Sequence, residues 1–352
     1  MHEPSSYPAL TGIRAVAALL VFMHHFGPEV PVFQHPAAQA LLSQGHTGVA
    51  LFFVLSGFLI ADRYWSVGRA GMMAFVLRRA GRLLPLYLVL TTATFLIPWL
   101  MEESPSPFPT MLFIANITLL RGWFADLWNT GIAQGWSLTA EATFYLVALP
   151  IIWTVRRNAL ALFIIPLALV LGGFLLVEAL GGRAPFGFLG TRGFFFAITF
   201  PGRSIEFMAG VGLAWALRSR NGLAPVRHAT WIGVVACAFI LAATAAFRID
   251  YDDRLGVLLL NFLLPLGIAV FFSGLIQERS WVRLFLESGP VQWMGRASYA
   301  FYLIHMGLVF QVINTHSPNL LITLIALQLL AWVLYRAIER PCNQWVKNRF
   351  PL

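Results

Sequence analysis

The sequence predicts an all-α protein that crosses a membrane about ten times, with both termini in the cytoplasm. Three observations predict this fold. Of the 352 residues, 59% are hydrophobic and 11% are charged, whereas soluble domains carry about 25% charged residues. Stretches such as 83–101 and 256–276 are apolar on all sides and long enough to span a bilayer as helices. The basic residues favour alternate connections. Together these features exclude a soluble enzyme and a disordered chain.

Ten apolar runs lie between charged, proline or glycine breaks, near 11–27, 46–62, 83–101, 137–155, 159–177, 203–217, 229–247, 256–276, 297–314 and 319–338. Ten spans of about 20 residues leave little chain for a second domain, so residues 1–352 are predicted to form one membrane domain. The connections 104–135 and 178–202 are long and apolar. We expect them to lie in the interface or to re-enter the protein.

The charges orient the chain. On these spans 17 Lys and Arg fall on one side, and six fall on the other: Arg121, Arg183, Arg192, Arg203, Arg248 and Arg254. The positive-inside rule therefore places both termini in the cytoplasm. The net charge of +9 belongs to this topology and does not indicate nucleic-acid binding. Cys237 and Cys342 have neither a close spacing nor a metal-binding one, so no disulfide or metal site is predicted.

The first span carries ionisable residues, and each costs a few kcal/mol in a membrane unless it has a partner or a function. Arg14 and His25 are eleven residues apart, which turns a helix by about 1100°, within about 20° of three full turns. They share one face, about 16 Å apart along the axis, while His24 points about 80° away. We therefore predict a functional His25 and a structural His24.

Other polar residues gather at span ends. Arg78, Arg79 and Arg82 lie at the cytoplasmic start of the third helix. The pairs 78/82 and 79/82 are i,i+4 and i,i+3 neighbours that can converge on a phosphate-rich ligand, although the positive-inside rule alone also places arginines there. Glu141 begins the fourth span with Tyr145 one turn below it. It is either a partner for the helix dipole or a buried functional acid.

Two further groups lie near the sixth and ninth spans. Arg203 and Glu206 form an i,i+3 pair that can neutralise itself. Tyr299, Tyr302 and His305 form a stripe at i, i+3 and i+6, and His305 reaches the middle of the membrane. Near the outer face, Trp123, Trp128 and Trp136 suit either sugar stacking or an interfacial belt.

Seven of these segments, in order along nearly the whole chain, resemble acyltransferase family 3, the bacterial integral-membrane O-acyltransferases. The segments are 10–19 with His25, 48–60, 78–85, 136–145, 203–210, 298–305 and 339–341. Thr11 and Ala50 stand where many members carry an aspartate. Many members also carry a C-terminal hydrolase-like domain, so this chain looks like a stand-alone member.

The resemblance implies transfer of an acyl group, most often acetyl from acetyl-CoA, to a carbohydrate hydroxyl outside the cytoplasm. The expected setting is surface or exo-polysaccharide modification at the bacterial inner membrane. Arg14 and His25 match the family's arginine-ten-residues-histidine motif, in which the histidine is catalytic. It would act as a general base or form an acyl-histidine. Acetyl-CoA would be a co-substrate, with no permanently bound cofactor and no metal.

On this interpretation the remaining residues divide into two sets. Arg14, Arg78, Arg79 and Arg82 hold the donor phosphates. Glu141 orients His25 or binds the acceptor, and the candidate contacts to the acceptor or tetrahedral intermediate are Arg203, Glu206, Tyr145, Tyr302 and His305. Ser56 lies outside any GxSxG elbow and is interpreted as a packing or hydrogen-bonding residue.

Two alternatives stay open at this point. The acceptor could instead be peptidoglycan, a glycolipid or a small secreted glycoside. A protein of another class, a proton-coupled transporter or a flippase for a lipid-linked sugar, would also use membrane-embedded His, Glu and Arg. That class predicts matching broken helices in the two halves of the chain, and no such symmetry is visible.

Overall fold

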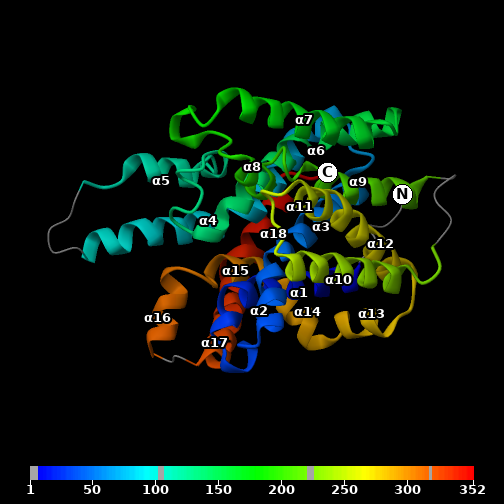
Figure 1. Ribbon diagram of the computed structural model, residues 1–352. Coiled ribbons are helices and arrows are strands. Elements are labelled where there is room, and N and C mark those ends of the chain that lie inside the picture. Colours follow the sequence, from blue (N-terminus) through cyan, green and yellow to red (C-terminus); the bar gives the residue numbers. More distant parts are fainter. Residues whose placement is uncertain (1–6, 102–106, 220–225, 317–318) are drawn as a thin grey trace.

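The computed structural model describes residues 7–101, 107–219, 226–316 and 319–352, and they form a bundle of α-helices (Figure 1). Within these ranges the single β pairing is an isolated bridge between Phe124 and Phe188. In the described part of the chain, eight helical stretches are long and apolar enough to cross a membrane: Pro8–Glu29, Pro36–Tyr64, Arg69–Met101, Ala133–Arg157, Ala161–Leu180, Ala229–Phe247, Arg254–Gln277 and Leu320–Arg349. The predicted all-α, multi-pass membrane architecture is confirmed.

Most predicted spans correspond to one helix or to a few helices that follow directly on one another. They are α1 (Pro8–Phe26), α3 (Gly48–Tyr64), α4 (Met72–Met101), α6 (Trp136–Arg157), α7 (Ala161–Leu180), α10 (Ala229–Phe247), α11 (Arg254–Gly256) with a π-helical turn and α12 (Leu264–Gln277), and α17 (Leu320–Leu334) with a π-helical turn and α18 (Arg340–Arg349). Shorter helices are α2 (Pro36–Ser43), α5 (Thr110–Ile117), α8 (Arg192–Ile198), α13 (Trp281–Leu286) and α14 (Gly289–Arg296).

Two predicted spans differ from continuous membrane helices. The run at 203–217 forms α9 (Ser204–Arg218), which has only 15 residues. The run at 297–314 is broken into α15 (Ser298–Ile304) and α16 (Leu308–His316). Gly307 lies between them with φ +75°, a conformation that ends a helix and suits glycine. A break of this kind at membrane depth is stable only inside the protein, and His305 beside it is fully buried.

The third membrane helix starts earlier than expected. The apolar run predicted a start near residue 83, but α4 begins at Met72. The helix includes Arg78, Arg79 and Arg82 near its start, as their helical spacing predicted. An apolar run marks only the part of a helix that lies in lipid. The helix can extend beyond that part through polar residues.

Close backbone packing fixes the position of α3 against α9. A Cβ atom on Gly57 would lie 2.0 Å from the Phe207 carbonyl oxygen, and one on Gly210 would lie 2.0 Å from that of Val54. Only glycine allows this approach. Helix α1 lies near the centre of the bundle, against α3, α14 and α15 (Figure 1). Helix α1 can therefore present side chains to the interior of the bundle.

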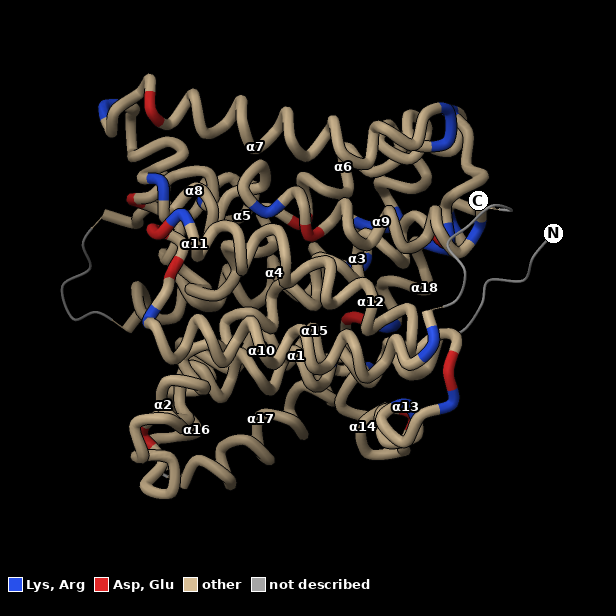
Figure 2. The backbone as a smooth tube through the Cα atoms, turned by 45° about the vertical axis from the view of Figure 1, so that its right-hand side comes forward, with Lys and Arg blue, Asp and Glu red and all other residues tan. Residues whose placement is uncertain are grey.

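The two long connections pack against each other. The backbone amide of Ala125 donates to the Gly187 carbonyl at 2.9 Å, and that of Leu189 donates to Trp123 at 2.8 Å. The first connection contains α5 and the second contains α8, and both lie at the end of the molecule away from the termini (Figure 2). Residues 102–106, which include the start of the first connection, lie outside the described residues.

Basic side chains gather near both termini. Figure 2 shows many Lys and Arg positions at the end where the N- and C-termini lie, and a smaller set at the opposite end. Arg220, which the charge count includes, lies outside the described residues. We call the end with the termini the terminal end.

Candidate active site

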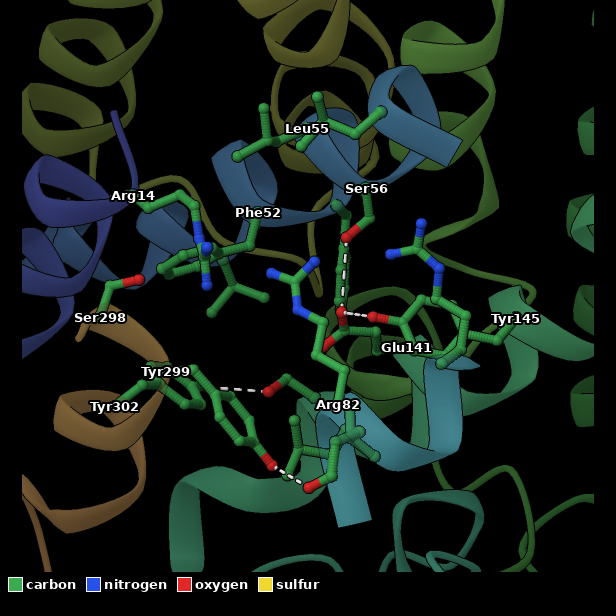
Figure 3. Close-up of a pocket in the computed structure, with 17 residues that line it drawn as sticks. Arg14, Phe52, Leu55, Ser56, Arg82, Glu141, Tyr145, Ser298, Tyr299 and Tyr302 are labelled. Carbon is green, nitrogen blue, oxygen red and sulfur yellow. Dashed lines mark hydrogen bonds between the residues drawn. The ribbon is translucent and has the colours of Figure 1, made fainter. Parts of the chain in front are cut away.

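A first cavity opens among α1, α3, α4, α6 and α15 (Figure 3), with an empty volume of about 740 Å³ that includes the open space at its mouth. We call it the arginine cavity. Its polar lining consists of Arg14, Ser56, Arg79, Arg82, Ser137, Glu141, Tyr145, Ser298, Tyr299 and Tyr302. Three guanidinium groups face one enclosed space, which suits a ligand with several negative charges.

The arginines come from two helices. In Figure 3 the guanidinium groups of Arg14 on α1 and Arg82 on α4 point toward each other. The Arg79 side chain is buried and lies over the ring of Tyr64 at 5.0 Å and that of Tyr145 at 5.5 Å. Cation–π contacts of this kind hold a guanidinium without neutralising it. The two rings therefore fix the position of Arg79 in the wall of the cavity.

Arg78 is placed differently from its two neighbours. It does not line the arginine cavity. Its Nε donates to the Phe350 carbonyl at 2.6 Å, and its Nη2 donates to the Lys347 carbonyl at 3.4 Å. The structure thus brings together Arg79, Arg82 and Arg14, and it uses Arg78 to hold the C-terminal segment.

Glu141 lies in the arginine cavity. Its Oε1 accepts a hydrogen bond from the Tyr145 hydroxyl one turn below and another from Ser56 Oγ at 3.5 Å. The carboxylate and Tyr145 therefore face the arginines. His25 lines a different cavity, so Glu141 and His25 do not form a dyad.

A second carboxylate near the arginines is Glu339, which belongs to the family-like segment 339–341 but was not among the predicted site residues. It ends the π-helical turn Tyr335–Glu339, is 6% exposed, and its charge interacts with those of Arg14 and Arg82. Its Oε2 has no hydrogen-bond partner among the described residues. The available signal was a lone acid at the end of the apolar run 319–338. Glu339 and Glu141 supply the acidic neighbours of Arg14 that Thr11 and Ala50 do not.

A second cavity, with an empty volume of about 780 Å³ including its mouth, lies farther along α1. We call it the histidine cavity. Its polar and aromatic lining consists of His24, His25, His46, Trp128, Asn129, Gln134, Trp136, Arg203, Tyr251 and Tyr302. The two long connections contribute to it: the first supplies Trp128, Asn129 and Gln134, and the second supplies Ala197 and Ile198.

Histidine rings cluster at this cavity. The ring of His25 lies 4.8 Å from that of His24 and 5.7 Å from that of His305, and the ring of His46 lies 5.4 Å from that of His24. Helical phase separated His24 from His25, but both side chains line the cavity. Within the described residues, no group of three or more His, Cys, Asp or Glu could hold a metal ion.

A buried ion pair forms another wall of the histidine cavity. Arg203 Nε lies 3.0 Å from Glu206 Oε2, with both side chains at most 2% exposed. Arg203 Nη1 also donates to the Tyr251 hydroxyl at 2.8 Å, and burial raises the pKa of that hydroxyl. Arg203 lines the cavity, whereas Glu206 does not and instead holds Arg203 in place.

Tyr302 and Val49 line both cavities, so they form the partition between them. The Tyr302 hydroxyl donates to the Gln134 carbonyl at 3.0 Å and shares a hydrogen bond of 2.9 Å with Ser137 Oγ. Gln134 Nε2 in turn donates to the Tyr302 carbonyl at 3.0 Å. Side chain and backbone of Tyr302 are thus both fixed to the loop that precedes α6.

The stripe on α15 runs alongside the path of α1. Tyr299 lines the arginine cavity and donates to the Leu83 carbonyl at 2.6 Å. Tyr302 touches both cavities, and His305 lies beside His25. In parallel, α1 presents Arg14 to the arginine cavity and His25 to the histidine cavity. Two helices therefore connect a cationic site with an imidazole site across the bundle.

The described geometry suits the transfer of a group from an anionic carrier. Guanidinium groups bind phosphates in a forked geometry, and an imidazole can accept a proton near neutral pH. Aromatic and amide side chains, as in Trp128, Trp136 and Gln134, suit a polyhydroxylated ligand.

Comparison with known proteins gives a consistent result. A family model described as an acyltransferase domain, that of acyltransferase family 3, matches residues 7–336. The acyltransferase MdmB of Streptomyces mycarofaciens is 26% identical over 98% of this chain and 94% of its own length. The O-acetyltransferase OatA of Staphylococcus aureus is 24% identical over 98% of this chain. The peptidoglycan O-acetyltransferase OatA of Listeria monocytogenes is 23% identical over 97% of it.

This chain spans 58% of the length of the Staphylococcus aureus protein and 56% of the Listeria monocytogenes protein. No solved structure matches the chain. The family match covers most of the sequence, and the relatives are named as acyltransferases and O-acetyltransferases. The chain therefore belongs to acyltransferase family 3 and is a multi-pass membrane O-acyltransferase.

Proposed function

We propose that this protein transfers an acetyl group from cytoplasmic acetyl-CoA to a hydroxyl of a carbohydrate on the other side of the bacterial inner membrane. The observation that carries the proposal is the placement of Arg14 and His25 in two cavities along α1, with Val49 and Tyr302 shared between those cavities. The terminal end, rich in arginine, is assigned to the cytoplasm by the positive-inside rule.

The arginine cavity is the proposed donor site. Arg14, Arg79 and Arg82 bind the phosphates at the nucleotide end of CoA. Glu141 and Glu339 balance part of this charge and orient the guanidinium groups. We therefore assign Glu141 and Tyr145 to the donor rather than to the acceptor, and Arg78 to neither. The thioester reaches His25 past the partition formed by Val49 and Tyr302.

The histidine cavity is the proposed acceptor site. Neutral His25 takes the proton of the acceptor hydroxyl as its oxygen attacks the thioester carbonyl carbon. The carbon–sulfur bond then breaks, and the proton passes to the leaving CoA thiolate. Arg203, held by Glu206 and Tyr251, is positioned to stabilise charge on the acceptor or on the tetrahedral intermediate. Trp128 and Trp136 offer stacking surfaces for a sugar ring.

The relatives support a carbohydrate acceptor, since one of them is named as a peptidoglycan O-acetyltransferase. Family membership also favours an enzyme over a transporter or flippase. The broken helix α15/α16, a feature expected of a transporter, is explained here by the placement of His305 beside His25.

The test is acetyl-CoA turnover by the purified protein in nanodiscs, followed as free CoA release with soluble oligosaccharides offered as acceptors. We expect His25→Ala to abolish transfer without changing the melting temperature, because the base is lost. His24→Ala is the matched control on the adjacent position, and it should retain much of the activity. An essential His24 with a dispensable His25 would contradict the assignment.

A further inference from the structure

His305 carries a buried nitrogen that packing does not explain. The side chain is fully buried, and its Nδ1 lies 2.8 Å from the Tyr302 carbonyl oxygen. A carbonyl only accepts hydrogen bonds, so Nδ1 carries the hydrogen. In the neutral ring Nε2 is then a lone-pair acceptor, and it has no partner among the described residues. An unsatisfied buried acceptor is destabilising, so this arrangement calls for an explanation.

The tautomer of His305 is held from two directions. The Tyr302 carbonyl that accepts from Nδ1 also accepts from Gln134 Nε2 at 3.0 Å. The ring of Phe301 stacks on the imidazole, with centroids 6.0 Å apart and an angle of 14° between the planes. The helix ends at this residue, which leaves the ring in the break between α15 and α16. His305 is therefore fixed in position and in tautomer.

His25 is the imidazole that faces this ring. Their centroids lie 5.7 Å apart, with 33° between the planes. A ring nitrogen lies about 1 Å from the centroid, so two imidazoles joined by a hydrogen bond of about 3 Å have centroids about 5 Å apart. The observed separation exceeds that value by about 0.7 Å, so the hydrogen bond forms when the His25 ring moves toward His305 by about that distance.

We propose that His305 is a positioning residue for His25: its Nε2 lone pair accepts a hydrogen bond from one nitrogen of His25 and leaves the other directed into the histidine cavity. This inference rests on the proposed function of His25 as base. When His25 takes the proton of the acceptor hydroxyl, both its nitrogens carry hydrogen, and the bond to His305 becomes charge-assisted. The bond therefore favours the protonated base during attack on the thioester.

Other titratable groups also face His25 and contribute to its behaviour. They are His24 on α1, His46 before α3, and Arg203 and Tyr251 on the opposite wall of the cavity. All of them stay unchanged in variants of His305, so a change in the titration of His25 in such variants reports the His25–His305 contact.

Two variants separate the two nitrogens of His305. In His305→Asn the side-chain amide replaces Nδ1 and still donates to Tyr302, but nothing replaces Nε2. In His305→Gln the amide reaches the place of Nε2, while the bond to Tyr302 is lost. A structural role predicts that the Asn variant works and the Gln variant fails. The positioning role predicts the opposite order.

The readouts are CoA release in nanodiscs and the pH dependence of His25 modification by diethyl pyrocarbonate, mapped by mass-spectrometric fragments that distinguish His25 from His24. For His305→Asn we expect turnover to fall about tenfold and the half-modification pH of His25 to fall by about one unit, the scale of one hydrogen bond to a charged group. His305→Gln should recover most of both.

An unchanged half-modification pH in a folded His305→Asn protein would overturn the proposal, as would an active Asn variant beside an inactive Gln variant. If His305→Asn does not fold, the Gln variant decides, because wild-type-like titration of His25 supports the contact and a lowered midpoint refutes it. If the wild type shows no acetyl-CoA turnover, the proposed function fails, whereas the modification experiment still tests the contact between the two histidines.

Discussion

Arg82 and Arg78 lie one turn apart on α4, and only Arg82 should contribute to donor binding. Arg82 points into the arginine cavity toward Arg14, whereas Arg78 is bonded to the backbone of the C-terminal segment (Figure 3). Replacing each by glutamine removes one charge and keeps much of the side-chain volume. The pair therefore provides its own control within one helix turn.

The expected magnitudes differ because the lost interactions differ. A hydrogen bond to a charged group contributes about 1.5–3 kcal/mol, and about 1.4 kcal/mol corresponds to a factor of ten. Arg82→Gln should therefore weaken CoA binding by roughly 10- to 150-fold. Arg78→Gln loses hydrogen bonds from a charged donor to the Phe350 and Lys347 carbonyls, each worth at most about 1.5–3 kcal/mol, and this loss appears in the free energy of unfolding. Its affinity for CoA should stay within about twofold of the wild type.

Isothermal titration of CoA into nanodisc protein measures the affinity directly, and the KM for acetyl-CoA gives a second reading. Melting temperatures establish that each variant is folded. The reasoning is refuted if Arg78→Gln weakens CoA binding as much as Arg82→Gln does, because the two side chains would then serve the same ligand.

Two further predictions concern the fold. Gly57→Ala places a Cβ 2.0 Å from the Phe207 carbonyl oxygen and should destabilise the protein by about 1–3 kcal/mol. The control is Gly172→Ala, whose added Cβ meets no atom within 4 Å. Equal melting temperatures for the two variants would show that α3 and α9 can separate freely. Glu278 accepts hydrogen bonds from the Thr230 hydroxyl at 2.5 Å, from the Thr230 amide at 3.0 Å and from the Ala229 amide at 2.6 Å. Burial opposes its ionisation, but these bonds, the one from the Thr230 hydroxyl foremost, hold its pKa below the usual value. The stability that ionised Glu278 contributes is present above the unfolded pKa of about 4.3 and is lost as the pH falls through the lower folded pKa. The difference in melting temperature between wild type and Glu278→Gln should therefore disappear in acid. A difference that stays constant with pH would contradict the assignment.

Local sequence patterns predicted the membrane helices well, because a long apolar run has few stable alternatives in lipid. They also identified Arg14 and His25 as residues of one helix face. The patterns could not show which of Arg78, Arg79 and Arg82 line the arginine cavity, because 78/82 and 79/82 are both neighbouring pairs on a helix surface. The choice depends on the Phe350 carbonyl, more than 250 residues away in the sequence. No periodicity in one helix contains that information.

The same limit applies to the cavities. Glu141 was predicted either to orient His25 or to bind the acceptor, yet α6 presents Glu141 to the arginine cavity while the turn preceding α6 contributes Gln134 to the histidine cavity. Hydropathy also did not reveal the break at His305, since the residues around Gly307 remain apolar. Its position follows from the buried contacts of His305, which depend on α1 being packed against α15.

The partition between the cavities also affects whether ions can leak across the membrane through this protein. An open aqueous route through a membrane protein dissipates the proton-motive force, whose electrical part is worth about 2.3 kcal/mol per charge for each 100 mV. Val49 and Tyr302, whose hydroxyl is held by Ser137 and the Gln134 carbonyl, stand between the two cavities. A barrier at this place would let the two cavities face opposite sides of the membrane without a continuous path for ions.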